Sequence, residues 1–446
     1  MAALTFEHSA AEAQPTVSMK TKTTKGHELT RIEESFCLQF FCLLFSVASC
    51  CASDWPQFLG PTRDGVYHGS DLGRAWPKDG PPLVWQTKIG QGFSGPVVAS
   101  GKLILFHRLE DKETVECLDA LTGKPLWSYD YSTHYRDDFG FDEGPRATPV
   151  MADGRVYTFG AEGALNCLEL ATGKKFWSVD AKTEFHAAKG FFGIASSPLI
   201  QGKALLLNPG GRDGAGIVAF DKDTGKILWK ATDDEASYSS PVAARIEGRE
   251  YAFFLTRAHL VATEPASGKI FFEFPFRPPI HSSVTAATPL IIGDLIFLSA
   301  SYDAGAVLLR FKEGSPEKMW SGKDILSNHY ATSVHHKDFL YGLHGRTDPG
   351  LEPPSLRCVE LQTGKVRWQQ DGFPAATITL AGEELLILTE RGELIRAPAS
   401  RSEFKPSARA QVLSAQVRAH PALANGLFYA RSKDKLVCVD LRHVER

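Results

Sequence analysis

The sequence predicts an all-β protein, an eight-bladed β-propeller in which each blade contains four strands. Three observations lead to this prediction. A Thr-Gly-Lys turn followed by a Trp recurs along the chain, a two-strand pattern precedes each copy, and the first and last copies are each incomplete in complementary ways. The copies are spaced by roughly 36 to 52 residues, a period typical of propeller blades.

The repeated turn reads "FDKDTGKILW" at residues 220–229, and similar copies begin at residues 118, 168 and 359. Its Gly permits a positive φ, and the preceding Asp or Glu can accept hydrogen bonds from the turn's backbone. The Trp is large and apolar with one N–H, which suits a contact between blades. The residues expected to perform these structural roles are Trp85, Trp127, Trp177, Trp229, Trp320, Trp368, Gly123, Gly173, Gly225, Gly268 and Gly364. Phe272 and Phe404 align with the Trp positions in the two remaining copies.

Two strands are predicted before each turn, in segments such as "SGPVVASGKLILF" and "ATPVMADGRVYTF". The last repeat, "KLVCVDL", has a third strand but no turn and no Trp, whereas "PPLVWQTKI" near the start supplies a lone Trp strand. Pairing this N-terminal strand with the C-terminal blade closes the ring and leaves no open sheet edge. We therefore assign residues 83–446 to the propeller and residues 54–82 to a separate N-terminal segment.

Residues 1–53 have the features of an export leader. Basic residues precede the apolar run at residues 36–51, which is too short to span a bilayer comfortably. "VASC" is similar to a bacterial lipoprotein box with Cys50 as the lipidated residue, and ordinary cleavage near Ser53 is the other route. A buried hydrophobic helix is the less favoured reading. We expect an exported protein, periplasmic or membrane-anchored in the cell envelope, whose translation starts at Met1 or Met19.

Four cysteines lie outside the leader, and we expect them to be free and buried. Cys117, Cys167 and Cys358 each lie ten positions before a repeat Trp, and Cys438 occupies the matching place in the last repeat. Other repeats have Ala at this position, so it is a small strand position where a thiol acts as a small hydrophobe. The sequence therefore predicts neither a disulfide framework nor a metal site.

The repeats resemble those of the pyrroloquinoline-quinone-like (quinoprotein-type) β-propeller family. The segments "DWPQFLGPTRDGV" and "GPRATPV" are similar to its exported bacterial branch. This family includes dehydrogenases that hold pyrroloquinoline quinone with calcium, an adjacent-Cys disulfide and a carboxylate base. It also includes the non-catalytic propeller lipoprotein of outer-membrane β-barrel assembly. The only adjacent cysteines here, Cys50 and Cys51, lie in the leader, and the resemblance therefore favours a binding or scaffold protein.

Composition limits the expected partners. The net charge is −3, the pI is near 6.5, and no basic stripe indicates nucleic acid. Asp221 and Asp223 match the first positions of a calcium-binding loop, but the twelfth position, which should be a bidentate Glu, is Thr232. We expect no metal, cofactor or catalytic residue, and a monomer that binds an envelope protein or a small ligand. The alternative is a dehydrogenase that uses pyrroloquinoline quinone and calcium to oxidise alcohols or sugars.

Candidate ligand-binding residues lie in the linkers between blades, which meet around the channel on one face of a propeller. These linkers are unusually polar and bring together His, Arg and carboxylate side chains suited to an anionic or sugar-like ligand or a peptide. The candidates are His134, Arg136, Asp138, Arg146, His186, Lys189, Arg277, His281 and His329. The alternative is that these are solvated loops, with Arg146 supporting its own loop through Asp142 or Glu143.

Overall fold

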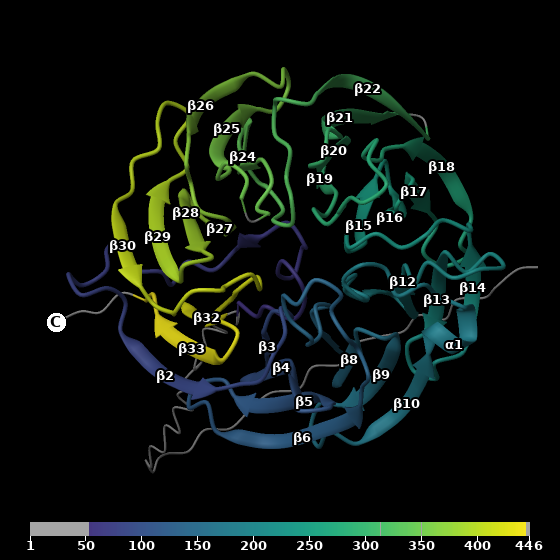
Figure 1. The fold of residues 1–446 in the computed structure, drawn as a ribbon. Coiled ribbons are helices and arrows are strands. Elements are labelled where there is room, and N and C mark those ends of the chain that lie inside the picture. Colours follow the sequence, from purple (N-terminus) through teal and green to yellow (C-terminus); the bar gives the residue numbers. More distant parts are fainter. Residues whose placement is uncertain (1–52, 313, 349, 443–446) are drawn as a thin grey trace, which may run out of the picture. The chain divides into compact units, whose positions relative to one another are not determined.

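The computed structural model describes residues 53–312, 314–348 and 350–442, and it shows eight β-sheets arranged in a ring (Figure 1). Each sheet is one blade, and almost all regular structure is strand. The predicted eight-bladed propeller is confirmed. The expected leader and Cys50 lie outside the described residues.

Six blades are formed by four strands that follow one another in the chain. Blade 1 contains β3 (Val97–Ala99), β4 (Lys102–Leu109), β5 (Lys112–Asp119) and β6 (Pro125–Ser132). Blade 2 contains β7 (Val150–Ala152), β8 (Arg155–Phe159), β9 (Ala164–Glu169) and β10 (Lys175–Asp180). Blade 3 contains β11 (Leu199–Gln201), β12 (Ala204–Leu207), β13 (Ile217–Asp221) and β14 (Ile227–Ala231).

The next three blades continue the same order around the ring. Blade 4 contains β15 (Val242–Ile246), β16 (Arg249–Leu255), β17 (His259–Thr263) and β18 (Ile270–Pro275). Blade 5 contains β19 (Leu290–Ile292), β20 (Leu295–Ala300), β21 (Gly305–Lys312) and β22 (Ser315–Gly322). Blade 6 contains β23 (Val334–His336), β24 (Phe339–His344), β25 (Ser355–Glu360) and β26 (Val366–Gln370).

Each of the last two blades contains one strand from the N-terminal part of the chain. Blade 7 contains β27 (Ala376–Ala381), β28 (Glu384–Thr389), β29 (Glu393–Pro398), β30 (Ala408–Gln411) and the short parallel strand β1 (Val66–Tyr67). Blade 8 contains β31 (Ala422–Ala424), β32 (Leu427–Arg431), β33 (Lys435–Asp440) and β2 (Leu83–Lys88). β2 pairs antiparallel with β33, as predicted, and so closes the ring.

The repeat Trp residues join neighbouring blades. Each donates its indole N–H to a backbone carbonyl of the next blade, and the N···O distances are between 2.8 and 3.1 Å. Trp229, for example, donates to Pro265 and lies against Gly268, whose φ is +74°. A Cβ on Gly268 would lie 2.5 Å from the Trp229 ring, so this turn needs glycine both for its backbone and for its contact.

A small residue lies directly across the sheet from each Trp in most blades. Cys117 pairs with Trp127, and Ala219 pairs with Trp229. Because the bulky indole fills the space beside it, the opposite position takes Cys or Ala. All four cysteines in the described residues, Cys117, Cys167, Cys358 and Cys438, are buried and free, as predicted. Burial raises the pKa of the Cys117 thiol to about 11, which makes this thiol unreactive.

Two aligned positions differ from this pattern. Phe272 lies in β18 opposite Ala262, and its ring packs against Phe311 of blade 5 at 5.3 Å between centroids. Phe404 does not lie in the outer strand of blade 7, because it precedes β30 and packs against Trp368. An aromatic contact therefore joins blades 4 and 5 in place of a Trp. The predicted alignment of Phe404 with the Trp positions is incorrect.

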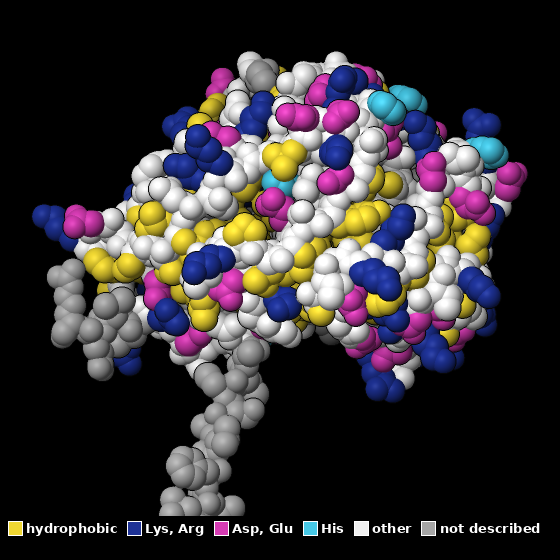
Figure 2. Space-filling model, turned by 90° about the horizontal axis from the view of Figure 1, so that it is seen from below, with side chains coloured by type: hydrophobic (Ala, Val, Ile, Leu, Met, Phe, Trp, Pro, Cys, Tyr) yellow, Lys and Arg dark blue, Asp and Glu magenta, His cyan; other side chains and the backbone are white. Residues whose placement is uncertain are grey.

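The outer edge of the ring exposes the residue that precedes most of the repeat Trp residues, Met319 before Trp320 being half-buried. The register shifts at this point, so the extra residue forms a β-bulge and its side chain reaches solvent. Figure 2 shows the resulting band of hydrophobic side chains between charged ones. The exposed hydrophobic residues at this position include Val84, Leu126, Phe176 and Leu228.

The single helix in the described residues is α1 (Ala181–Phe185), which Asp180 caps by accepting hydrogen bonds from the N–H groups of Lys182 and Thr183. Within that part of the chain, no helix has the length and hydrophobicity needed to span a bilayer.

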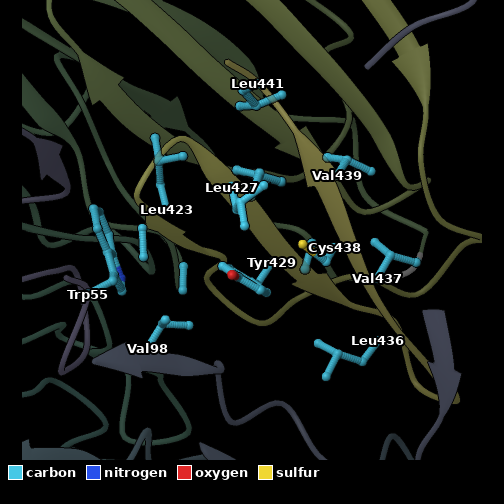
Figure 3. Packing of buried hydrophobic residues seen from close by; sticks show 14 of the residues in the cluster. Trp55, Val98, Leu423, Leu427, Tyr429, Leu436, Val437, Cys438, Val439 and Leu441 are labelled. Carbon is cyan, nitrogen blue, oxygen red and sulfur yellow. The ribbon is translucent and has the colours of Figure 1, made fainter. Parts of the chain in front are cut away.

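The N-terminal segment packs into the core beside blades 1 and 8. Trp55 is 2% exposed and lies near Val98 of β3 and Leu423 of β31 (Figure 3). Its backbone also pairs with Val98 through two hydrogen bonds of 2.7 and 2.8 Å. This anchoring positions the residues after Trp55 inside the ring.

Candidate functional site

The channel is surrounded by the first strand of each blade, since these strands contact one another around most of the ring. In every blade the antiparallel order places the turns between strands 1 and 2 and between strands 3 and 4 on one face. We call this the turn face. The opposite face contains the linkers from one blade to the next, and we call it the linker face.

Residues 53–67 enter the channel from the turn face and leave on the same side. Ser53 donates its backbone N–H to Asn425, and Asp54 accepts from the N–H of Ser100, both in turns between strands 1 and 2. Further along, Phe58 reaches His420, and their rings meet edge to face at 5.1 Å. The chain then returns as β1 along β27. This segment therefore forms a floor within the channel.

Arg63 fixes the floor to two blades on the far side. Its guanidinium donates to the carbonyls of Pro198 in blade 3 and Pro241 in blade 4, the latter at 2.8 Å, and to the side chain of Gln57 at 3.0 Å. Arg63 is 3% exposed, and burial lowers its pKa to about 9. A buried guanidinium is tolerated here because backbone carbonyls surround it.

A series of hydroxyl groups above the floor joins the blades around the channel. The residue before the first strand's Pro accepts, through its hydroxyl, the backbone N–H of the equivalent residue in the preceding blade. Thr148 accepts from Gly95 at 3.1 Å, Ser197 from Thr148 at 2.9 Å, and Ser240 from Ser197 at 2.9 Å. The pattern is interrupted at blade 5, where the Thr288 hydroxyl has no partner in the described structure. Blades 1, 7 and 8 have Gly95, Pro374 and His420 at this position.

A cavity of about 170 Å³ lies on the linker-face side of this floor. Its lining combines many aromatic rings with a few charged or polar groups, the composition typical of a small-molecule site. The aromatic residues are Phe58, Phe93, Phe141, Phe192, Tyr238, Tyr302 and Tyr330. The charged or titratable residues are Arg146, His329, Asp348, Arg418 and His420.

The charges in the cavity do not cancel. Arg146 forms an ion pair of 3.0 Å with the buried carboxylate of Asp137, and Asp348 pairs with Arg346 at 2.6 Å. Arg418 forms no ion pair within the described part of the chain. Its guanidinium instead lies over three aromatic rings, at 5.2 Å from the centroid of Phe141 and 5.9 Å from those of Phe93 and Tyr330.

The two cavity histidines are neutral at neutral pH. Burial lowers the pKa of His329 to about 4 and that of His420 to about 4. His329 is oriented by Thr347, 2.7 Å from Nδ1, and by the Tyr302 hydroxyl, 3.1 Å from Nε2. In contrast, His420 Nε2 and the Tyr330 hydroxyl are buried without a hydrogen-bond partner among the described residues.

Of the nine residues predicted from the linkers, two line the cavity, three form ion pairs between or within linkers, and four are exposed. Arg146 and His329 line the cavity. The carboxylate partner of Arg146 is Asp137, and its guanidinium also supports its own loop by donating to the backbone carbonyl of Asp142 at 3.1 Å. Lys189 and Asp138 form an ion pair of 2.7 Å between two linkers, and Arg136 pairs with Glu143 at 2.9 Å. The other four, none of which lines the cavity, are exposed on the linkers: His134, His186, Arg277 and His281.

The sequence placed Tyr330 on the channel face beside His329, but it did not identify Arg418, Phe58, Tyr238 or Tyr302, and it assigned His420 a structural role. One signal was present, because the residue before the Pro of each first strand always faces the same part of the channel. His420 occupies this position in "VRAHP", where blades 2 to 6 have Ser or Thr. A titratable side chain in place of the repeated hydroxyl is therefore the signal that the sequence offered for His420.

The residues present do not fit calcium-bound pyrroloquinoline quinone. Within the described residues, no group of three or more His, Cys, Asp or Glu side chains is placed to hold a metal ion. The four described cysteines lie in separate blades and are not adjacent. The carboxylate in the cavity, Asp348, is paired with Arg346 and therefore is not available as a free base.

The fold is similar to that of several solved structures. BamB from Moraxella catarrhalis has 15% identity and a TM-score of 0.60, covering 82% of this chain and 99% of that one. Quinohemoprotein alcohol dehydrogenase from Comamonas testosteroni has 15% identity and a TM-score of 0.61, covering 88% and 81%. At these identities the likeness establishes the fold alone. No curated protein matches the sequence.

The sequence profile of one family matches residues 111–370, which is more than half of the chain. These residues include the repeat turns of blades 1, 2, 3, 4 and 6, the linkers that contribute Arg146 and His329, and the loop between β24 and β25 that contributes Asp348. The chain therefore belongs to the family described as outer membrane protein assembly factor BamB.

Proposed function

We propose that this protein is an exported, non-catalytic propeller of the cell envelope that binds a small ligand in the channel cavity. The observation that carries the proposal is the cavity itself, which has a closed floor, an aromatic lining and a guanidinium without a carboxylate partner. These features come from the linkers, from the N-terminal segment and, for Tyr302, from the loop between β20 and β21, whose residues do not repeat. Binding at this face leaves the rest of the ring free to act as a scaffold.

The cavity's size also supports binding in preference to quinone chemistry. A cavity of about 150 Å³ is known to enclose one benzene molecule, so 170 Å³ suits a ligand of similar size. A fused-ring cofactor with several carboxylates needs more enclosed space and more cationic partners. Metal-dependent quinone catalysis also needs a donor set that the cavity lining does not supply, because its only carboxylate is Asp348.

A fragment screen with two matched variants tests the proposed site. Ala286→Trp places a large ring in the cavity, whereas Ala171→Trp adds the same ring at an exposed turn on the opposite face. We expect ligand-observed NMR to detect fragments that bind the wild type and Ala171→Trp but not Ala286→Trp. Equal binding to both variants, or no binding to the wild type, would contradict the proposal.

Dye reduction tests the enzymatic alternative. The purified protein is incubated with pyrroloquinoline quinone, calcium and a series of alcohols or sugars. We expect no turnover above the background of free quinone. Turnover that Ala286→Trp abolishes would establish a dehydrogenase and overturn the non-catalytic assignment.

Export and anchoring are tested separately in cells. Labelling with palmitate is expected to mark the full-length protein in the envelope fraction and to fail for Cys50→Ser. An unlabelled wild type in the soluble periplasm would favour ordinary cleavage near Ser53, and a cytoplasmic protein would contradict export.

A further inference from the structure

We propose that the ligand of the channel cavity is a small aromatic carboxylate with a single ring, whose carboxylate is bound by Arg418. This inference rests on the proposed binding function and adds the chemical class of the ligand. Three independent features of the cavity support it: its net charge, its unpartnered polar groups, and the size and character of its lining.

The first feature is the unbalanced charge of Arg418. The cavity contains two arginines, and Arg146 is already neutralised by Asp137 at 3.0 Å. Asp348 is likewise neutralised by Arg346. Because the described carboxylates leave Arg418 without an ion pair, the cavity has an excess of one positive charge. A ligand with one negative charge restores the balance, and a planar carboxylate matches the guanidinium fork.

The second feature is a pair of hydrogen-bonding groups that lack a partner. The Tyr330 hydroxyl and His420 Nε2 both belong to residues that line the cavity, and neither atom has a hydrogen-bond partner in the described structure. His420 is 8% exposed. Buried polar atoms are normally paired, so two orphan groups in one cavity indicate a polar ligand atom between or beside them. Because burial keeps His420 neutral, its Nε2 can carry a proton and donate to a carboxylate oxygen.

The third feature is the aromatic lining. Phe93, Phe141 and Tyr330 surround the Arg418 guanidinium, and Phe58 and Phe192 line the same cavity. Aromatic rings pack well against one another in offset or edge-to-face arrangements, which favours an aromatic ligand over an aliphatic one of equal charge. The volume of about 170 Å³ is close to that of a cavity that encloses one benzene molecule, so it suits a ligand with one ring.

Matched ligands separate the contributions of charge and ring. Isothermal titration calorimetry measures binding of benzoate, benzyl alcohol, cyclohexanecarboxylate and inorganic phosphate to the intact protein. We expect benzoate to bind at least tenfold more tightly than benzyl alcohol, which lacks the charge, and severalfold more tightly than cyclohexanecarboxylate, which lacks the aromatic ring. Phosphate is expected to bind more weakly than benzoate, because it cannot fill the aromatic part.

Variants locate the charge. Arg418→Met keeps most of the side chain's length and should weaken benzoate binding at least tenfold, while Arg418→Lys should retain part of the affinity. Arg245→Met removes an exposed arginine on the turn face and should leave binding unchanged. Far-ultraviolet circular dichroism and thermal unfolding check that each variant is folded.

Two outcomes would overturn this inference in different ways. If benzyl alcohol binds as tightly as benzoate, or if Arg418→Met binds benzoate normally, the ligand class is wrong but the cavity remains a binding site. If no ligand in the series binds and the fragment screen also fails, the proposed function falls together with the inference.

Discussion

The outer rim of the ring and its channel are built from the sequence in different ways. On the rim, a Trp of one blade meets a Gly of the next at five interfaces: Trp85–Gly123, Trp127–Gly173, Trp177–Gly225, Trp229–Gly268 and Trp320–Gly364. In the channel, the cavity depends on single occurrences such as Arg418, His420 and Phe58. The repeated contacts hold neighbouring blades together, and the residues that occur once form the channel cavity.

This difference predicts that rim and channel substitutions have separable effects. Rim variants should lower stability without changing ligand binding in the folded protein. Variants of the cavity wall should change binding with little effect on stability. The interface between blades 4 and 5 differs from the other rim contacts. Phe272 and Phe311 replace the Trp–Gly contact there and provide no indole hydrogen bond.

The largest effect is expected from Trp229→Ala. Trp229 is 9% exposed, packs against Gly268 and donates to the Pro265 carbonyl. Its truncation should lower the free energy of unfolding by about 3–5 kcal/mol in urea titrations. Trp229→Phe keeps a ring but loses the donor, so its cost should be about 1 kcal/mol beyond any loss of packing. A loss below about 1 kcal/mol for Trp229→Ala would show that the rim does not hold the blades together.

A smaller loss is expected from an added methyl group at Gly268. Gly268→Ala combines a positive φ with a Cβ only 2.5 Å from the Trp229 ring, and we expect a cost of about 3 kcal/mol. Gly248→Ala is the matched control in the same blade, since its φ is +79° but a Cβ there meets nothing within 4 Å. It should cost about 1 kcal/mol. Equal losses would mean that the backbone conformation, and not the Trp contact, requires glycine.

The rim could be predicted from the sequence because its contacts recur. Trp229 and Gly268 belong to consecutive copies of the same turn, and the recurrence of that turn in five copies identifies both their spacing and their role. The same logic predicted that β2 would complete the blade of β33. The repeats therefore allowed the number of blades and the closure of the ring to be predicted from the sequence alone.

The channel could not be predicted to the same extent. Phe58 and Arg418 are 360 positions apart, and no local pattern indicates that they line one cavity. Charge alone favoured exposed linker residues such as Arg136, which is 65% exposed and paired with Glu143. The cavity depends on how far each linker reaches inward, and on the N-terminal segment that forms its floor, which are properties of the whole ring.

An intermediate effect is expected at the channel floor. Arg63→Met removes the donor to the Pro198 and Pro241 carbonyls and leaves them buried without that partner. We expect the free energy of unfolding to fall by about 1–3 kcal/mol, because unsatisfied buried acceptors are costly. Limited proteolysis should then cut the N-terminal segment while the ring remains intact. Arg245→Met, at an exposed position, is the control, and equal stability of the two variants would contradict a role for Arg63 in holding the floor.

The smallest effect is a pH dependence that arises from the buried histidines of the channel. Burial lowers the pKa of His420 from 6.5 to about 4, so the unfolded chain binds a proton in this range that the folded chain does not. Its contribution to stability is complete above pH 6.5 and is lost progressively as the pH falls toward 4. The slope from one such residue is at most about 1.4 kcal/mol per pH unit.

Unfolding in urea at pH 7.5, 6.5, 5.5 and 4.5 measures this slope. His420→Gln should lose stability less steeply below pH 6.5 than the wild type, since one of the titrating groups is gone. His281→Gln changes an exposed linker histidine and should keep the wild-type slope. If His420→Gln retained the full wild-type slope, His420 would not be buried in its neutral form, and the channel would be open to solvent from the linker face.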